Sequence, residues 1–284
     1  MPIANGEILK DALHNHYAVP AFSAHSFDMV DAILEESQSE NYPVIIQIGQ
    51  RAIRNQQMQS LSDYIRYRAQ SLTVPVVIHL DHSHDFSQVV QALRAGFTSC
   101  MIDASLLPFG ENVALTRDVV HVCHSVSVPV EGELGTIGGV EDDAYVAEED
   151  VVYTPVDAAA HFVAQTGVDS LAVAIGSAHG MYRREPKLDL ERLKQIQEAV
   201  RIPIVLHGGS GIPREQVRKA ISLGIAKINF DTELRIAFMN GWREAVRENA
   251  DDPFSASLAA QSSLRETVKE KIAWCGGHSD HAFS

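Results

Sequence analysis

The chain has 284 residues and a formal net charge of −14, which argues against nucleic acid and anionic membrane surfaces as partners. Its hydrophobic content of 45% and charged content of 21% are those of a globular protein, and its longest apolar stretches are too short to cross a membrane. Three scattered cysteines and a first segment without a basic start favour a cytoplasmic protein, and the length favours one domain over residues 1–284.

Short apolar segments alternate with helical stretches along the chain. Strands are predicted at residues 19–22, 44–49, 76–81, 99–104, 128–134, 170–176, 202–207 and 226–230. Helices are predicted after them at residues 27–40, 61–71, 86–95, 113–125, 155–166, 190–200, 214–222 and 233–249. This α/β alternation indicates a parallel sheet, and eight repeats favour a closed (β/α)8 TIM barrel over an open doubly wound sheet. Extra helices are predicted at residues 6–16, placed to cover the barrel bottom, and at residues 258–274.

Two connections are longer than the usual few residues, at 135–154 and 176–187. Long loops at the carboxyl end of a barrel often serve as lids, and Gly138-Gly139 offers a hinge in the first of them. The alternative is a solvated acidic loop. The sequence favours the lid.

Three histidines lie at the carboxyl ends of three predicted strands. His82, His179 and His207 lie too far apart for a local motif, so they meet only if their strands are parallel neighbours in one barrel. Imidazole is a preferred ligand of zinc, and catalytic zinc sites keep three protein ligands and one open position. The pattern therefore predicts a divalent metal site.

Carboxylates lie beside these histidines. Asp81 precedes His82 and is predicted to transfer protons, or else to orient a histidine. Glu131 and Glu133 share one face of a strand, and Asp103 ends another. These three either hold a second divalent ion or pair with Lys or Arg inside the barrel, and the residues alone leave both open.

The segments after the last two strands predict a phosphate site. They carry Gly208-Gly209-Ser210 and Asn229-Phe230-Asp231-Thr232, at the place where barrels often bind phosphate through backbone N–H groups. Metal, phosphate site and carboxylates together suit proton abstraction or carbon–carbon cleavage on a phosphorylated ketose. Because Lys227 lies inside a strand, a metal-stabilised enediolate is favoured over a Schiff base.

Two other classes of function compete with this interpretation. A metal-dependent barrel hydrolase favours a His-x-His pair after the first strand, where this chain has only His25. A non-catalytic subunit is expected to have lost ligands, and here the set is complete.

The same residues carry a family resemblance. The matching motifs are His79-Leu80-Asp81-His82, Met101-Ile102-Asp103-Ala104-Ser105, Glu131-Gly132-Glu133-Leu134-Gly135, Gly138-Gly139-Val140-Glu141-Asp142, Ala178-His179-Gly180, Leu206-His207-Gly208-Gly209-Ser210 and Asn229-Phe230-Asp231-Thr232. Over essentially its full length the chain resembles the class II, metal-dependent ketose-bisphosphate aldolases, and most of all their tagatose-bisphosphate branch.

The resemblance implies roles for these residues. His82, His179 and His207 are expected to bind a catalytic Zn²⁺, and Asp103 and Glu133 match a second metal position. Asp81 is expected to donate a proton to the oxygen at the cleaved bond, Glu141 on the mobile loop to exchange the proton of dihydroxyacetone phosphate, and Asn229 to steady the enediolate. Dihydroxyacetone phosphate is expected to bind to Gly180, Gly208, Gly209, Ser210, Asn229, Phe230, Asp231 and Thr232. Family members are homodimers or homotetramers, and some bind Na⁺ or K⁺ near the phosphate loop.

The departures from the family pattern cluster in the half of the site that holds the aldehyde. The family's Asp-Pro-Arg, whose arginine grips the distal phosphate from a neighbouring subunit, is here Asp252-Pro253-Phe254. The family's asparagine after the first strand is replaced here by Ser23. Its small, Gly/Ser-rich turn after the second strand is replaced by Gln50-Arg51-Ala52-Ile53-Arg54. The expected substrate is a ketose of the tagatose or fructose 1,6-bisphosphate type; the alternative is a ketose 1-phosphate with another distal group, such as a 6-sulfonate or a 6-deoxy sugar. Arg51 or Arg54 then binds a distal anion, or both are solvated helix residues.

Overall fold

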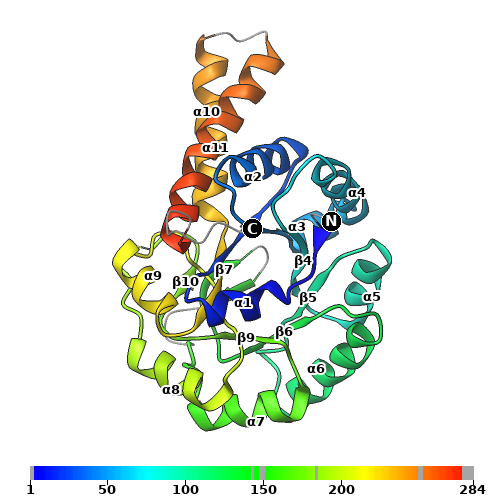
Figure 1. Cartoon of the computed structure of the whole chain (residues 1–284), viewed down its shortest axis with the longest axis vertical. Helices are drawn as coiled ribbons and strands as arrows, with labels where there is room; N and C mark the ends of the chain where they lie inside the picture. The colour runs from blue at the N-terminus through cyan, green and yellow to red at the C-terminus, as the bar shows by residue number, and fades with distance from the viewer. Residues whose placement is uncertain (1–2, 142–143, 147–150, 183–184, 249–251, 277–284) are drawn as a thin grey trace.

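Parallel strands close into a barrel at the centre of the molecule (Figure 1). The computed structural model describes residues 3–141, 144–146, 151–182, 185–248 and 252–276, and only the backbone at residues 140, 141 and 144–146. The barrel strands are β2 (Val19–Ser23), β3 (Val44–Ile48), β4 (Val76–Ser83), β5 (Ser99–Ile102), β6 (Val130–Leu134), β9 (Ser170–Val173), β11 (Ile204–Leu206) and β12 (Ile225–Phe230). Each pairs in parallel with the next, and β12 pairs with β2, so the ring is complete. The predicted (β/α)8 barrel is confirmed.

Helices surround the barrel (Figure 1). They are α2 (Phe27–Ser39), α4 (Met58–Ala69), α5 (Phe86–Arg94), α6 (Phe109–His124), α7 (Val156–Thr166), α8 (Leu190–Val200), α9 (Arg214–Ile221) and α10 (Thr232–Glu248). The extra N-terminal helix α1 (Ile8–His14) packs on β2 and β12 and lies across one end of the barrel, and the short β1 (Ile3–Ala4) pairs with β4.

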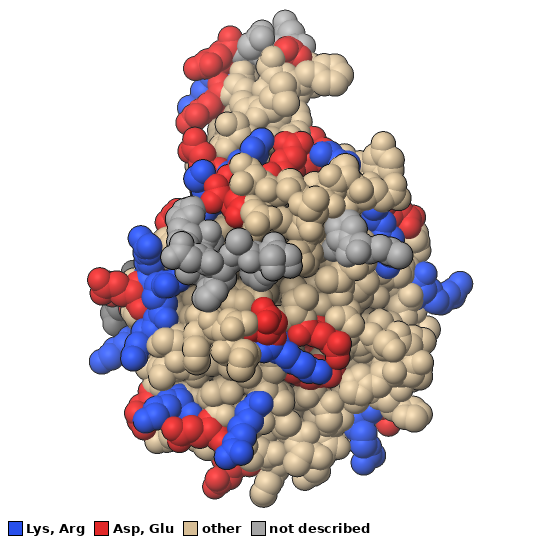
Figure 2. Space-filling view, viewed as in Figure 1, with Lys and Arg blue, Asp and Glu red and all other residues tan. Residues whose placement is uncertain are grey.

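The C-terminal helix α11 (Pro253–Cys275) packs along α10, and the two helices form an arm that projects beyond the barrel. It begins at Pro253 rather than at residue 258, because proline suits a first turn and the Asp252 carboxylate accepts the Phe254 N–H at 3.0 Å. On the face shown in Figure 2, acidic side chains line this arm with Lys and Arg interspersed among them.

Strand alternation sorts side chains between the barrel interior and the surrounding helices. Along β4, Ile78 and Leu80 are fully buried in the hydrophobic cluster, while His79 makes polar contacts inside the barrel. The polar residues that meet inside the barrel follow the same two-residue period: Gln47 on β3, His79 and Asp81 on β4, Glu131 and Glu133 on β6, and Lys227 and Asn229 on β12. The barrel interior is therefore a column of polar groups with its open end at the strand carboxyl termini.

Three segments for which the sequence predicted no helix or strand contain regular structure. The connection at 135–154 holds the antiparallel strands β7 (Gly138–Glu141) and β8 (Ala144–Val146), and β7 pairs in parallel with β10 (Ala178–His179) from the other long connection. The segment after β3 forms a short helix, α3 (Gln50–Arg54). The two long connections are thus joined to each other at His179, and lid movement stays a prediction.

Gly139 makes this junction possible. Its φ is +103°, and an added Cβ would lie 2.1 Å from the carbonyl oxygen of His179. We expect Gly139→Ala to separate β7 from β10 and to lower kcat/KM roughly 10²-fold, the typical effect of misplacing catalytic groups by about an ångström. The melting temperature should change little, because the hairpin lies outside the barrel sheet.

Gly110→Ala is the matched control for this prediction. An added Cβ at Gly110, in α6, meets nothing within 4 Å, so its activity should equal that of the parent. Parental kcat/KM in Gly139→Ala would show that the junction with His179 does not matter for turnover.

Candidate active site

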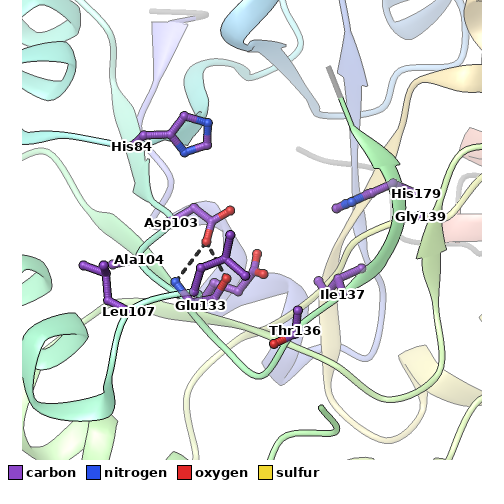
Figure 3. Close-up of a pocket in the computed structure, with 11 residues that line it drawn as sticks. His84, Asp103, Ala104, Leu107, Glu133, Thr136, Ile137, Gly139 and His179 are labelled. Atoms are coloured by element: carbon purple, nitrogen blue, oxygen red, sulfur yellow. Dashed lines mark hydrogen bonds between the residues drawn. The ribbon is translucent and has the colours of Figure 1, made fainter. Parts of the chain in front are cut away.

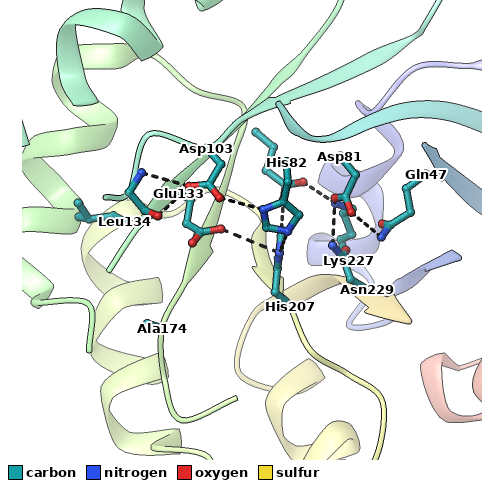
Figure 4. A network of polar contacts seen from close by, with 12 residues as sticks. Gln47, Asp81, His82, Asp103, Glu133, Leu134, Ala174, His207, Lys227 and Asn229 are labelled. Atoms are coloured by element: carbon teal, nitrogen blue, oxygen red, sulfur yellow. Dashed lines mark hydrogen bonds and ion pairs between the residues drawn. The ribbon is translucent and has the colours of Figure 1, made fainter. Parts of the chain in front are cut away.

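Three histidines converge at the carboxyl end of the barrel: Figure 4 shows His82 beside His207, and Figure 3 shows His179 at the neighbouring pocket. His82 is at the end of β4, His207 directly follows β11, and His179 is in β10. Nε2 of His82 and Nδ1 of His207 are 2.8 Å apart, and the His179 ring centroid lies 5.2 Å and 5.8 Å from those of His82 and His207. One ring nitrogen from each residue lies within 4.8 Å of the others. Three imidazoles that offer nitrogens to one point fit a divalent ion with a position left for substrate.

The His207 ring is suited to ligation by its protonation state. Burial lowers the pKa of His207 to about 4, even though the neighbouring Glu131 carboxylate opposes the shift. The ring is therefore neutral near pH 7, as a metal ligand must be.

The backbone at His82 is held in an uncommon conformation. Its φ is +43°, and the pairing of β4 with β5 shifts register between Leu80 and Ser83. Two hydrogen bonds secure this bulge: Gln50 donates to the His82 carbonyl at 2.7 Å, and the Ser83 hydroxyl donates to the Met101 carbonyl. Such local strain persists only where its surroundings impose it, and it is common in functional sites.

Asp103 and Glu133 form a second group with His82. The Asp103 carboxylate accepts from Nδ1 of His82 at 2.9 Å and from Ser105, and ligand atoms of His82, Asp103 and Glu133 lie within 4.8 Å of one another. Burial opposes ionisation of Asp103, but these hydrogen bonds hold its pKa well below the usual range. Asp103 therefore orients His82 in this structure, and the same oxygens can serve a second ion.

Glu131 and Glu133 turn out to serve different purposes, although they share one strand face. Glu131 pairs with Lys227 at 2.7 Å and accepts from His207 at 2.8 Å. Glu133 instead lies 4.0 Å from Nδ1 of His207, within the second group. The two alternatives left open for these carboxylates therefore divide between them: an internal ion pair for Glu131 and a candidate ion position for Glu133.

Asp81 is buried at the open end of the barrel, between two amides (Figure 4). Its carboxylate accepts from Gln47 at 3.0 Å and from Asn229 at 3.3 Å, and Gln47 also donates to Ser23 at 3.1 Å. Among the described residues, Oδ1 of Asn229 and Oε1 of Gln47 are buried without a hydrogen-bond partner. Unsatisfied buried oxygens beside a carboxylate indicate a place where a polar ligand binds.

The predicted phosphate segments lie together at the ends of β11 and β12. Gly208 has a φ of +63°, and an added Cβ there would lie 2.2 Å from the Ala178 carbonyl oxygen. The hydroxyl of Tyr182 receives the Ala178 N–H at 2.8 Å and donates to the Gly208 carbonyl at 2.9 Å. These contacts bring the Gly180 loop, where φ is +94°, beside the Gly208 loop.

The Gly180 and Gly208 loops and residues 229–232 are together called the glycine cradle, and residues 229–232 lead into α10. The N–H of Gly209 donates to the Asn229 carbonyl at 2.9 Å, and the Ser210 hydroxyl accepts the Glu233 N–H at 3.4 Å. Asp231 directs its carboxylate to His25 and Arg235, and Arg235 also donates to Thr232. Phe230 is fully buried beneath the loop. Because its carboxylate is engaged by His25 and Arg235, Asp231 positions the cradle in this structure.

A pocket opens beside His179 (Figure 3). It lies between the second group and the β7 strand and is lined by His84, Asp103, Ala104, Ser105, Leu106, Leu107, Glu133, Thr136, Ile137, Gly139 and His179. The pocket therefore connects the predicted metal positions with the long connections.

Other predicted residues lie on α3, on the arm and on β7. Arg51 and Arg54 are on α3, partly buried and exposed respectively. Phe254 is 81% exposed on the projecting arm. The side chain of Glu141 lies outside the described residues, although its backbone belongs to β7.

Several residues that shape the site had no role predicted from the sequence. Gln47 and Gln50 bond to Asp81 and to the His82 backbone, and Tyr182 joins two loops. Their only sequence signal is position, since Gln47 and Gln50 flank the end of β3 and Tyr182 follows His179 closely.

Comparisons with known proteins agree with this architecture. Residues 4–280 match the family model described as fructose-bisphosphate aldolase class-II. A sulfofructosephosphate aldolase from Alkalicoccus urumqiensis is 41% identical over 272 residues, covering 95% of each chain. The crystal structure of the YdjI aldolase from Escherichia coli K12 is 38% identical, covers 98% of each chain and superposes with a TM-score of 0.86. A fructose-bisphosphate aldolase from Campylobacter jejuni, 23% identical with a TM-score of 0.81, shares the fold over 96% of this chain and 95% of its own.

Fold and comparisons together define a carbon–carbon lyase built on a (β/α)8 barrel. The chain belongs to the class II fructose-bisphosphate aldolase family. This membership favours aldolase chemistry over the competing barrel hydrolase. Within the part of the chain that the structure describes, no helix has the length and apolarity needed to cross a bilayer.

Proposed function

We propose that the protein is a zinc-dependent aldolase that cleaves a ketose 1-phosphate with a sulfonate at carbon six. The products are dihydroxyacetone phosphate and a sulfonated three-carbon aldehyde. The observation that carries the proposal is the convergence of His82, His179 and His207 beside Asp81 and the glycine cradle.

The proposed chemistry assigns one proton transfer to each of two carboxylates. His82, His179 and His207 would hold a divalent ion, which when bound would polarise the substrate carbonyl. Asp81 accepts the proton of the hydroxyl on carbon four as the bond between carbons three and four breaks. Glu141 delivers a proton to carbon three, where the electron pair is left. Asn229 donates to Asp81 at 3.3 Å and so keeps that carboxylate aimed at the reacting oxygen.

The cradle is proposed to hold the phosphate on carbon one. Glycines at 180 and 208 allow backbone to approach the phosphate, and the first turn of α10 adds the positive end of a helix dipole. Ser210 and Thr232 contribute hydroxyls. We also propose a Na⁺ or K⁺ ion near this loop. The protein is proposed to be a homodimer or homotetramer, with a single domain over residues 1–284 and a cytoplasmic location.

The group at carbon six of the substrate is inferred from the residue at position 254 on the arm and from a relative. Phe254 occupies the place of the family's distal-phosphate arginine, and phenylalanine donates no hydrogen bond. A relative covering 95% of the chain is named for sulfofructosephosphate. A sulfonate carries one negative charge where a phosphate carries nearly two, so it needs fewer cationic partners. Arg51 or Arg54 is proposed to bind it.

We expect the 6-sulfonated ketose 1-phosphate to be cleaved with a kcat/KM roughly ten- to a hundredfold above that of fructose and tagatose 1,6-bisphosphates. Loss of one charge-assisted contact is worth about that factor. Release of dihydroxyacetone phosphate, measured by a coupled assay, compares the substrates, together with 6-deoxyfructose 1-phosphate as the uncharged member. Arg51→Ala or Arg54→Ala should raise KM for the sulfonated substrate and leave KM for 6-deoxyfructose 1-phosphate unchanged.

The arm supplies a gain-of-function test. Phe254→Arg should raise kcat/KM for the bisphosphates about tenfold through one restored ion contact. Leu258→Arg is the matched control, because Leu258 lies one turn further along α11 and is 65% exposed. A parent enzyme that prefers bisphosphates, with neither arginine variant changing the ratio, would contradict the sulfonate assignment and leave the aldolase chemistry standing.

A further inference from the structure

A line of polar side chains runs inward from His207 through the barrel interior. Nε2 of His207 is 2.8 Å from Oε1 of Glu131, and Oε2 of Glu131 is 2.7 Å from Nζ of Lys227. Lys227 continues to Nε2 of His79 at 3.2 Å, and Nδ1 of His79 is 2.8 Å from the Ser99 hydroxyl. The line crosses the barrel, because β6 and β12 are not neighbouring strands.

Stability alone does not account for this line. Glu131, Lys227, His79 and His207 are each no more than 1% exposed. Buried ion pairs lose their hydration, and well-packed apolar side chains in their place are often equally stable or more so. The interior of a small barrel is ordinarily filled by branched apolar residues. The charged pair therefore calls for a role beyond packing.

Donor and acceptor matching fixes the protons along the line. The Lys227 ammonium only donates, so Nε2 of His79 accepts and its Nδ1–H donates to Ser99. The Glu131 carboxylate only accepts, so it receives one proton from Lys227 and one from Nε2 of His207. His207 is then left with an unprotonated Nδ1, and this is the nitrogen that faces His82 at 2.8 Å.

We propose that Glu131, itself held by Lys227, is a positioning residue that keeps the proton of His207 on Nε2 and presents Nδ1 to the metal. The inference rests on the proposed metal centre. A carboxylate behind a ligating histidine fixes the ring and its tautomer and strengthens the ligand, and loss of such a partner typically weakens metal binding 10- to 100-fold.

The first experiment measures zinc affinity rather than turnover. Metal-free protein competes for zinc with a chromophoric chelator, in the parent and in Glu131→Gln. The glutamine keeps the shape but faces one of its two donor neighbours with an NH₂ group, so we expect zinc affinity to fall roughly 10- to 100-fold. Glu36→Gln is the matched control: Glu36 is a buried carboxylate on α2 that accepts from Arg265 at 2.9 Å, away from the barrel interior. It should leave zinc affinity unchanged.

A second variant covers the case in which Glu131→Gln leaves Lys227 unpaired and does not fold. The double variant Glu131→Met/Lys227→Met removes both charges together, so no buried ion lacks a counter-ion and Nε2 of His207 is left without this acceptor. We expect it to fold and to bind zinc as weakly as the single variant. Parental zinc affinity in either variant would overturn the proposal, whereas a parent that binds no zinc would instead overturn the proposed function.

Nitrogen NMR of ¹⁵N-histidine-labelled parent protein reads the tautomer directly. We expect at least one zinc-bound ring to be coordinated through Nδ1 with its proton on Nε2. His82 cannot supply that pattern, because its Nδ1 is bonded to Asp103. Coordination of every zinc-bound ring through Nε2 would overturn the proposal, whatever the variants show.

Discussion

Removal of the divalent ion is expected to abolish carbon–carbon cleavage, with residual kcat at least roughly 10³-fold below that of the loaded enzyme. A Lewis acid at a substrate carbonyl supplies several kcal/mol of transition-state stabilisation. No other described group can replace it, because the lysine inside the barrel, Lys227, is tied to Glu131 and His79. The measurement is turnover after chelation, with metal content followed by elemental analysis.

Restoring the ion provides the control for this result. Zinc or cobalt should recover activity and magnesium should not, because the site offers three imidazole nitrogens and magnesium prefers oxygen ligands. Borohydride added with substrate should trap no covalent adduct, since no amine nucleophile takes part. Full turnover by protein shown to be free of metal, or a borohydride-trapped adduct on Lys227, would contradict the metal-dependent route.

The placement of the three histidines could be predicted because it depends on one rule of the fold. Parallel strands in a barrel bring all their carboxyl ends to one rim, so His82 and His179 become neighbours although they are 97 positions apart. The same rule explains why Asp81 and Asn229, which were not predicted to meet, are in hydrogen-bond contact in the structure. Strand ends are thus informative even without knowledge of side-chain packing.

Cross-barrel partners could not be predicted from the sequence. Glu131 and Glu133 have the same strand face and the same residue type, yet one meets Lys227 and the other faces His207 and the second group. The choice depends on strand stagger, which alternation alone does not determine. For the same reason His79 had no assigned partner before the structure placed it beside Lys227.

Local backbone conformations also could not be predicted from the sequence. The left-handed backbone at His82 follows from the bulge in β4, which Gln50 and Ser83 secure through tertiary contacts. The β7–β8 hairpin depends on pairing of β7 with β10, a contact between two segments that each lack a strong strand pattern. Such features arise from contacts distant in sequence, so periodicity does not reveal them.

Replacement of Asp81 is expected to remove most turnover while leaving the metal in place. Asp81→Asn keeps the size of the side chain and its position between Gln47 and Asn229, but an amide cannot accept the substrate proton. Loss of a positioned acid or base lowers kcat roughly 10²–10⁴-fold. The Asp81 carboxylate bonds to Gln47 and Asn229, whereas the His82 ring bonds to Asp103 and His207, so the change should not reach the His82 ring. Zinc content and zinc affinity should therefore match those of the parent.

Asp85→Asn is the matched control for this substitution. Asp85 lies four positions later, where its carboxylate caps α5 by accepting from Gln88 at 2.9 Å. Asparagine is an equally good cap, so the variant should keep both stability and kcat. If Asp81→Asn instead loses zinc in proportion to activity, Asp81 orients a metal ligand and transfers no proton. If it keeps zinc and turns over at the parental rate, the proton of the carbon-four hydroxyl goes to another group, and Asp81 has no part in cleavage.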